Sequence, residues 1–299
     1  MLEVSHVLSV AIGLLLSLAV QSDACYCGIE GVQPMIHNGK EAIPGQYPWI
    51  VYVGYMLLGQ SENRLTSCAG TIINDRFILT SAHCLDPPEP QIIASSVGLE
   101  LGVWIGDAIR PADLILSDAV EVRGWVQHEN YTTGEFTTDV ALIELESPLQ
   151  FNLSFSPICL PDFVDYDNLM AAGWGLVANP EVEPESLMAA EMTIIPDDVC
   201  HAVYPELSDH EMCAGDERKN VCPGDSGGPL MTRRSGIVYQ AGITAAGTTT
   251  SGDDCGLTQN PGIFEKISSH LEWIQQNSGS DAKWCRAPFQ AIKNPHRTD

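Results

Sequence analysis

From residue 47 onward, apolar and β-branched residues occur in short runs that are separated by Gly, Pro, Asn and Asp. No run keeps a helical period beyond a few turns until the last part of the chain. Short runs bounded by turn residues are typical of β-strands, so the pattern predicts an all-β fold. The dipeptide Asn74-Asp75 predicts a tight hairpin between two of them. The predicted strands are residues 49–55, 70–73, 77–80, 120–126, 140–145, 188–195, 238–245 and 263–267.

One helix is expected after the last strand. Ser269 and Glu272 have the spacing of an N-terminal capping box, and Leu271 and Ile274 fall on one helical face. We expect this helix to end near residue 277, and we interpret residues 278–299 as a C-terminal tail.

The chain opens with a different pattern, an apolar stretch at residues 7–20. This length matches the core of a secretory signal peptide and is shorter than the ~20 residues that a bilayer span requires. Small residues at Ser22 and Ala24 offer cleavage sites, so we predict a signal peptide over residues 1–24 and a secreted, extracellular protein. A short membrane anchor is the alternative interpretation of this stretch.

Composition narrows the range of partners. The chain has 39 Asp and Glu against 14 Lys and Arg, a formal net charge of −25. Nucleic acids and anionic membranes attract clustered Lys and Arg, so we expect neither as a partner. The ten cysteines, an even number, favour disulfides formed in an oxidising compartment and therefore agree with secretion.

Three separated segments carry residues that together suit nucleophilic catalysis. They contain His83, Asp139 and Ser226, the last within Gly224-Asp225-Ser226-Gly227-Gly228. A serine hydroxyl needs a base within hydrogen-bond reach, and that base needs an orienting group on its other nitrogen. Asp139 precedes an apolar run, where a lone buried carboxylate is costly unless it is paired. A tight glycine turn also lets the backbone amides of Gly224 and Ser226 point at a developing oxyanion.

With these residues in the order His, Asp, Ser, the sequence resembles the chymotrypsin/trypsin family of serine endopeptidases from residue 36 to residue 277. The resemblance implies two six-stranded antiparallel β-barrels with a C-terminal helix. His83 and Asp139 would come from the first barrel, Ser226 would come from the second, and the triad would lie in the cleft between them. Further motifs of the family are Pro48-Trp49, residues 157–161, Gly173-Trp174-Gly175 and Pro261-Gly262.

The resemblance also implies a set of disulfides. The implied pairs are Cys68 with Cys84, Cys200 with Cys213, Cys222 with Cys255, and Cys27 with Cys159. Elimination leaves Cys25 with Cys285, which would join the tail to the amino-terminal segment, and Cys25 and Cys27 could exchange roles. A zinc site at Cys25-x-Cys27 is the weaker alternative, because the pair has no second pair of ligands.

Family members are usually made as zymogens, and the resemblance places the new amino terminus at Ile36. Its ammonium group would pair with Asp225. We therefore divide the chain into a signal peptide (1–24), a propeptide segment (25–35), a peptidase domain (36–277) and the tail. The residue before Ile36 is Met35 rather than Arg or Lys, which favours an activator with an apolar pocket, and autoactivation is one hypothesis.

The family's specificity pocket would have Asn220 at its floor, with Gly247 and Gly262 at its walls. A buried Lys or Arg would find no counter-charge at Asn220, so trypsin-like specificity is disfavoured. A large uncharged residue (Leu, Met, Phe or Tyr) is expected, which is a chymotrypsin-like or elastase-like preference. Ala245 and Ala246 depart from the usual Ser-Trp, and we expect this to reduce efficiency with short substrates.

The remaining expectations concern partners and modifications. Asn130 and Asn152 lie in N-glycosylation motifs. No metal or other cofactor is expected. In the family one loop supplies calcium ligands, and here that loop would contain Gly102-Val103-Trp104 where an acidic residue is needed. The partners would be protein or peptide substrates and proteinaceous protease inhibitors, and the protein would be a monomer. Acidic residues at 248–254 and near Glu183 suggest a preference for basic residues beside the cleaved bond.

Two other functions compete with a chymotrypsin-like peptidase. A protease-fold binding or cofactor protein with a silent site would suit Met35, Ala245 and Ala246, but the complete set of catalytic residue types argues against it. A trypsin-like cascade enzyme conflicts with Asn220.

Overall fold

The computed structural model describes residues 25–31, 40–58, 63–64, 66–88, 98–106, 109, 114–135, 137–177, 182–215, 219–246 and 261–288. The predicted signal peptide lies outside these residues. So do four positions named above: Met35, Ile36, Gly247 and Cys255.

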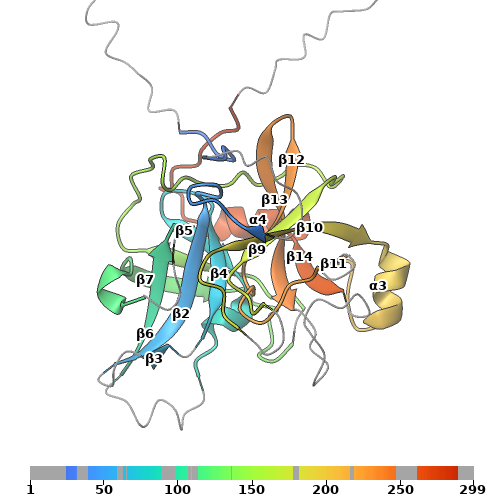
Figure 1. Ribbon diagram of the computed structural model, residues 1–299, viewed down its shortest axis with the longest axis horizontal. Coiled ribbons are helices and arrows are strands. Elements are labelled where there is room, and N and C mark those ends of the chain that lie inside the picture. Colours follow the sequence, from blue (N-terminus) through green and yellow to red (C-terminus); the bar gives the residue numbers. More distant parts are fainter. Residues whose placement is uncertain are drawn as a thin grey trace, which may run out of the picture.

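The first half of the chain forms an antiparallel barrel of six main strands (Figure 1). Their hydrogen-bonded order is β2-β4-β5-β8-β7, with β6 on the other side of β2 and the two-residue β3 (Asn63–Arg64) at the end of β2. The amide of Val120 donates to the carbonyl of Val103 (2.8 Å), which joins β6 to the segment before β7. The strands are β2 (Ile50–Leu58), β4 (Cys68–Ile72), β5 (Phe77–Thr80), β6 (Gly98–Ile105), β7 (Val122–Gln127) and β8 (Ala141–Leu145).

The second half forms another antiparallel barrel of six main strands, to which the two-residue β1 (Lys40–Glu41) adds along β10. The order is β10-β11-β14-β13-β12-β9, and β9 also pairs with β10, so the sheet closes on itself. Its strands are β9 (Leu169–Gly173), β10 (Met188–Ile195), β11 (Glu211–Gly215), β12 (Pro229–Arg234), β13 (Ile237–Ala246) and β14 (Gly262–Lys266). The expected architecture of two six-stranded barrels with a C-terminal helix is therefore confirmed.

The C-terminal helix α4 (Ile267–Asn277) follows β14 directly. The predicted capping box is wrong: the N-cap is Lys266, and no side chain caps the helix. Ser269 and Glu272 lie inside the helix, and Glu272 accepts a hydrogen bond from Gln276 (2.9 Å). The buried face is instead formed by Ile267, His270, Trp273 and Ile274.

Short helical elements complete the described part. The 3-10 helices are η1 (Ala82–Leu85) and η3 (Leu116–Asp118), and α3 (Asp197–Val203) lies at the outer edge of the second barrel (Figure 1). The Cys200–Cys213 disulfide joins α3 to β11. No helix within the described ranges has the length and apolar character needed to cross a membrane.

The two barrels share one hydrophobic core. Trp49 and Tyr52 of the first barrel belong to the same buried cluster as Trp174 and Met231 of the second. The Tyr52 and Trp174 rings meet edge to face, with centroids 5.7 Å apart. Rings of this size bury ~150–250 Å² each, so they dominate the packing energy. The shared core fixes the barrels against each other and with them any site between them.

Both ends of the described chain are attached to the barrels. Cys25 is disulfide-bonded to Cys285, and Cys27 is bonded to Cys159. The amide of Cys27 also donates to the carbonyl of Arg286 (3.0 Å). Cys285 and Arg286 of the predicted tail are therefore held beside the amino-terminal segment.

Candidate active site

His83 and Asp139 lie close together because they flank adjacent strands of the first barrel. His83 lies in η1, directly after β5, and Asp139 lies just before β8, which pairs with β5 through Thr80 and Ala141. The Asp139 side chain is fully buried. Its Oδ1 accepts the backbone N–H of His83 (2.8 Å), and its Oδ2 lies 2.5 Å from His83 Nδ1. A carboxylate there selects the tautomer with hydrogen on Nδ1, so Nε2 is the nitrogen that accepts a proton.

The environment of His83 strengthens it as a base. Burial lowers the pKa of His83, but the hydrogen bond and charge of Asp139, together with the charge of Asp86, outweigh it, and the pKa is raised above its usual value. Asp86 is itself held by the Tyr131 hydroxyl (2.6 Å) and the Gln127 amide (3.0 Å). These contacts keep a second negative charge near the imidazole, which is 26% exposed.

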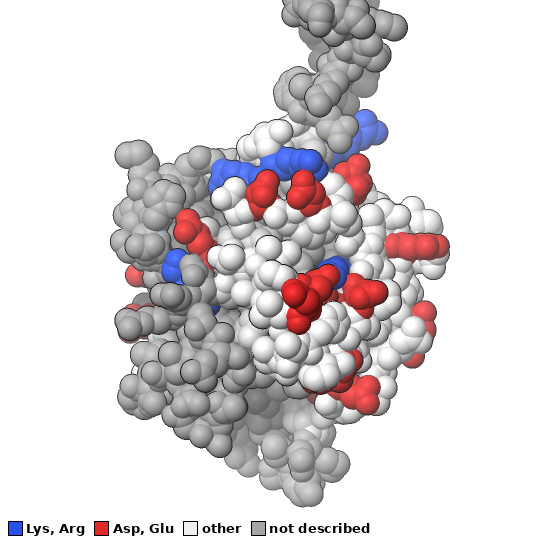
Figure 2. All heavy atoms as spheres, turned by 90° about the vertical axis from the view of Figure 1, so that its right-hand side faces the viewer, with Lys and Arg blue, Asp and Glu red and all other residues white. Residues whose placement is uncertain are grey.

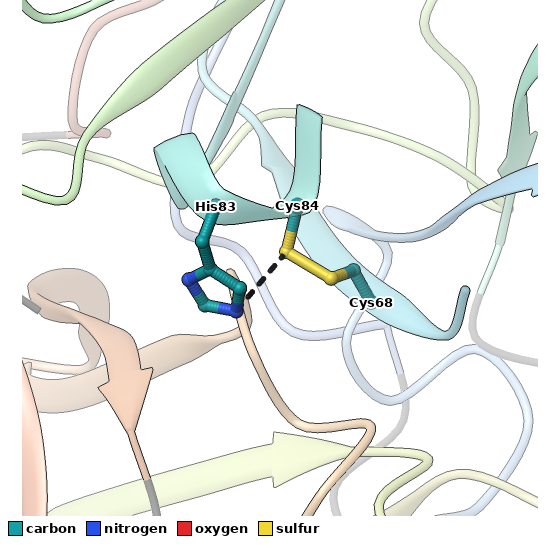
Figure 3. A group of neighbouring side chains, drawn as sticks. All are labelled: Cys68, His83 and Cys84. Atoms are coloured by element: carbon teal, nitrogen blue, oxygen red, sulfur yellow. Dashed lines mark hydrogen bonds between the residues drawn. A yellow bond between two sulfur atoms is a disulfide. The ribbon is translucent and has the colours of Figure 1, made fainter. Parts of the chain in front are cut away.

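A disulfide packs against the imidazole. Cys84 Sγ lies 3.9 Å from His83 Nε2 and is bonded to Cys68 on β4 (Figure 3). Within the described residues these three side chains are the group whose spacing could suit a metal ion. Both sulfurs are in the disulfide, however, and thiolates are the sulfur ligands that zinc requires. The disulfide therefore anchors η1 to β4, and the residues do not fit a metal.

The turn that carries Ser226 packs against the segment that leads to His83. The carbonyl of Ser226 accepts the amide of Ala69 (2.7 Å). A Cβ at Gly227 would lie 2.1 Å from Thr80 Oγ1, and Gly227 has a φ of +77°. Only glycine suits this conformation and this contact. The structure thus brings Ser226, which is partly exposed, beside the end of β5 and the start of η1.

Asp225 is enclosed by glycines and backbone amides. Its carboxylate accepts the amides of Gly175 (2.7 Å) and Cys222 (2.8 Å). A Cβ at Gly173 or Gly175 would lie 2.2 or 2.3 Å from a carboxylate oxygen, so the Gly-Trp-Gly motif makes room for this group. Burial raises the pKa of Asp225 to about 6, although the two amides oppose the shift. Asp225 is half-buried, and no cation among the described residues pairs with its carboxylate.

Two of the three predicted pocket residues lie together. A Cβ at Gly262 would lie 2.7 Å from Asn220 Oδ1 and 2.7 Å from Val221 Cγ2. The same Oδ1 accepts the amide of Val221 (2.9 Å). Ala245 and Ala246, at the end of β13, are buried. A side chain at Gly262 would therefore fill the space beside Asn220.

Comparison with known families decides the identity of this arrangement. The family model for trypsin matches residues 36–274. The chain belongs to the trypsin family of serine proteases. Its matched part covers both barrels and most of α4.

Several known proteins have sequences similar to this chain. The chain is 31% identical to serine protease filzig of Drosophila melanogaster, over 88% of this chain and 16% of that protein. It is 32% identical to mannan-binding lectin serine protease 1 of Homo sapiens, over 82% of this chain and 36% of that protein. The chain thus spans about a sixth and about a third of these two relatives. It is also 32% identical to the venom peptide isomerase heavy chain of Agelenopsis aperta, over 81% of this chain and 99% of that protein.

The structure also shows the pairing of most cysteines and the exposure of both glycosylation motifs. Within the described ranges, four disulfides have the predicted pairings, with Cys25 bonded to Cys285 and Cys27 bonded to Cys159. Cys222 is also disulfide-bonded, while its expected partner Cys255 lies outside the described residues. Asn130 and Asn152 are exposed.

Acidic side chains are spread over the described surface. On the face in Figure 2, Asp and Glu lie in several separate groups, and Lys and Arg gather along one edge with Asp and Glu beside them. Glu183 is half-buried, and residues 248–254 lie outside the described residues, so the suggested acidic rim remains a prediction.

Glu265 touches the site but was not predicted from the sequence. Glu265 on β14 is fully buried, and its Oε1 accepts the backbone N–H of Asp139 (2.7 Å). A signal was present in the sequence, because Glu265 follows Ile263 and Phe264 in a run predicted as a strand.

Proposed function

We propose that this trypsin-family chain is a serine endopeptidase in which Ser226 attacks the peptide carbonyl, His83 takes its proton and Asp139 orients the imidazole. The observation that carries the proposal is the double contact of the buried Asp139 carboxylate with the backbone and Nδ1 of His83. The packing of the Ser226 turn against Thr80 and Ala69 supports the position of the nucleophile.

The reaction proceeds through an acyl-enzyme. As Ser226 Oγ bonds to the carbonyl carbon, its proton passes to His83 Nε2, and His83 then donates that proton to the leaving amine. Water hydrolyses the ester in a second step with the same base. The amides of Gly224 and Ser226 stabilise the oxyanion in both steps, and the φ of +101° at Gly224 is of the kind that glycine adopts readily.

Activation couples a new amino terminus to Asp225. Cleavage after Met35 releases the Ile36 ammonium group, which pairs with the Asp225 carboxylate. The enclosed position of that carboxylate and its raised pKa support this step, since a partly desolvated carboxylate is stabilised by a counter-charge. The pair then holds the turn that carries Gly224 and Ser226.

The activator has an apolar pocket, because Met35 precedes the cleaved bond, and the enzyme itself is one candidate. Ser226→Ala protein expressed alone tests autoactivation. The variant chain stays intact if the enzyme cleaves itself, and cleavage after Met35 would contradict autoactivation.

The substrate preference is for Leu, Met, Phe or Tyr before the cleaved bond. Asn220 beside Gly262 provides a polar floor without charge, which supports this preference. Asn220→Asp should shift cleavage toward Lys and Arg, as measured by kcat/KM on peptides that differ only at that residue. Unchanged selectivity would contradict the role of Asn220.

The protein acts outside the cell on protein or peptide substrates, as a monomer that proteinaceous inhibitors can block. Its disulfides are consistent with an oxidising compartment. Basic residues that flank the cleaved bond are preferred. Equal cleavage of Lys-flanked and Glu-flanked peptides at all salt concentrations would contradict that preference.

The function is tested by reacting the secreted protein with a fluorophosphonate probe and measuring its mass intact and after disulfide reduction. A chain that is cleaved after Met35 and carries one probe supports the peptidase. A cleaved chain that carries no probe contradicts it, and Ser226→Ala is the matched control that must stay unlabelled.

A further inference from the structure

Behind the triad, on the side of the second barrel, lies a buried group of acidic and histidine side chains. Glu265 of β14 and Glu211 of β11 are directly opposite each other in the sheet. They are 0% and 3% exposed, and His270 of α4 is 4% exposed. Two carboxyl groups in such positions are costly unless each has hydrogen-bond partners.

These two glutamates hold successive amides of the chain that leads to Asp139. Glu265 Oε1 accepts the N–H of Asp139 (2.7 Å), and Glu211 Oε1 accepts the N–H of Thr138 (3.4 Å). Thr138 has a φ of +56°, a strained conformation for a β-branched residue. The turn that presents Asp139 to His83 is therefore held in place by side chains of the other barrel.

His270 and the histidines around it hold the Glu265 carboxyl group in place. Its Oε2 lies 2.8 Å from His270 Nε2. The His270 ring contacts His128 and His210, with centroids 5.5 and 5.9 Å away. The titratable groups that face this pair are thus Glu211 from β11, Asp139 from the turn before β8, His210 from the turn before β11, and His128 from the segment after β7.

We propose that Glu265 is a positioning residue of the catalytic triad, because its carboxyl group, bridged to His270, holds the backbone N–H of Asp139 and so fixes the Asp139 carboxylate against His83. This inference rests on the proposed peptidase function. It adds a residue from β14 that touches neither the substrate nor the reacting atoms.

The charge state follows from the surroundings. Burial, together with the charges of Glu211 and Asp139, raises the pKa of Glu265 to about 9, although its hydrogen bond from the Asp139 amide opposes the shift. Burial also lowers the pKa of His270. Both shifts favour the uncharged form of each group, in which the Glu265 O–H donates to His270 Nε2. A protonated Glu265 therefore places no negative charge beside the backbone of Asp139.

Two substitutions at Glu265 distinguish a positioning role from a role in packing alone. Glu265→Gln keeps an oxygen for the Asp139 amide and an N–H for His270, so kcat at pH 7 should stay within about twofold of the wild type. Glu265→Leu leaves the Asp139 amide without its acceptor. Its kcat should fall by about tenfold to a hundredfold, as for a misplaced catalytic group, with KM nearly unchanged.

The control for lost packing is Thr232→Val. Thr232 on β12 is 3% exposed, and its hydroxyl donates to the carbonyl of Asp167 (2.6 Å). This variant also loses a buried hydrogen bond, but it should keep the wild-type kcat. All rates are expressed per fluorophosphonate-titrated site, so partial unfolding does not lower them. A wild-type kcat in Glu265→Leu would overturn the proposal.

A second measurement does not depend on catalysis. In ¹⁵N-aspartate-labelled Ser226→Ala protein, the Asp139 amide signal should show a step with pH whose midpoint is about 9, separate from the step caused by His83. Glu265→Gln should abolish the step near pH 9 and keep the step from His83. An Asp139 amide signal at the same position in both proteins at every pH would overturn the contact. If the wild type hydrolyses no peptide while the amide still titrates, the peptidase function fails and the Glu265 contact stands.

Discussion

At the level of single residues, the chemistry could be predicted where a short motif carries it. His83, Asp139 and Ser226 were identified from their neighbours in sequence, and the structure brings His83 and Asp139 into contact. Glu265 was missed because its role depends on a partner 126 positions away, the Asp139 amide. No local pattern encodes a contact between strands of different barrels, although a glutamate inside an apolar strand was a signal that could have been used.

Asp139→Asn should lower kcat by about 10³- to 10⁴-fold with little change in KM. The amide can donate to Nδ1 and so favours the tautomer with hydrogen on Nε2, which cannot take the proton of Ser226. Steady-state kinetics on a peptide with Leu or Phe before the cleaved bond measure the change. A loss of less than tenfold would be at odds with an orienting role.

Glu265→Gln should change how stability depends on pH. The pKa of Glu265 is about 9 in the folded protein and about 4.5 ordinarily. Since the folded pKa is raised, the stability that this group contributes is fully present below about pH 4.5 and is lost as pH rises to about 9. Glutamine does not titrate, so the free energy of unfolding of the variant should rise relative to that of the wild type as pH increases across that window.

The measurement is the free energy of unfolding of both proteins in urea at several pH values. A difference that stays flat between pH 5 and pH 9 would contradict a protonated Glu265.

At the level of elements, some strands were predictable from β-branched residues and others were not. The loop expected at residues 102–104, where the family supplies calcium ligands, is wrong, because these residues lie in β6 and pair with β2. The bounds predicted for β5 and β10 agree with the structure. The sequences of β9 (LMAAG) and β11 (EMCAG) have no β-branched residue, and β12 begins with proline and ends in two arginines. These strands form because the closed barrel supplies neighbours on both sides, which is tertiary context that propensity does not contain.

The start of α4 offers a test of this kind of local reasoning. Ser269 is exposed inside the helix rather than at its N-cap. Ser269→Ala should therefore change the free energy of unfolding by less than about 0.5 kcal/mol, whereas loss of a true cap costs about 1 kcal/mol. Urea denaturation at pH 7 measures it. A destabilisation of about 1 kcal/mol or more would mean that Ser269 does cap the helix.

At the level of the whole molecule, the two barrels followed from the family resemblance rather than from periodicity, and their joint core is seen only in the structure. The pattern of apolar runs predicted an all-β fold, but it did not indicate where the sheets close. Elimination did identify Cys25 and Cys285 as partners, because the family pairs accounted for the other eight cysteines. What it could not show is that Arg286 also exchanges backbone hydrogen bonds with Cys25 and Cys27.

Replacing both Cys25 and Cys285 with alanine should lower the free energy of unfolding by about 2–4 kcal/mol, the usual range for a disulfide that closes a long loop. The kcat should not change, because the disulfide lies outside the residues proposed for catalysis. Thermal denaturation and peptide kinetics on the same preparation check both parts. A loss of kcat in the folded variant would show that the tail supports the site.

The central claim is that Ser226 is the nucleophile and that His83 activates it. Its most direct test is to react the Ile36-released enzyme with a fluorophosphonate, locate the adduct by peptide mapping, and compare the labelling rate with that of His83→Ala. We predict a single adduct on Ser226 and a rate that falls by at least about a thousandfold without the imidazole. An adduct on another residue, or equal labelling rates in the two proteins, would contradict the account.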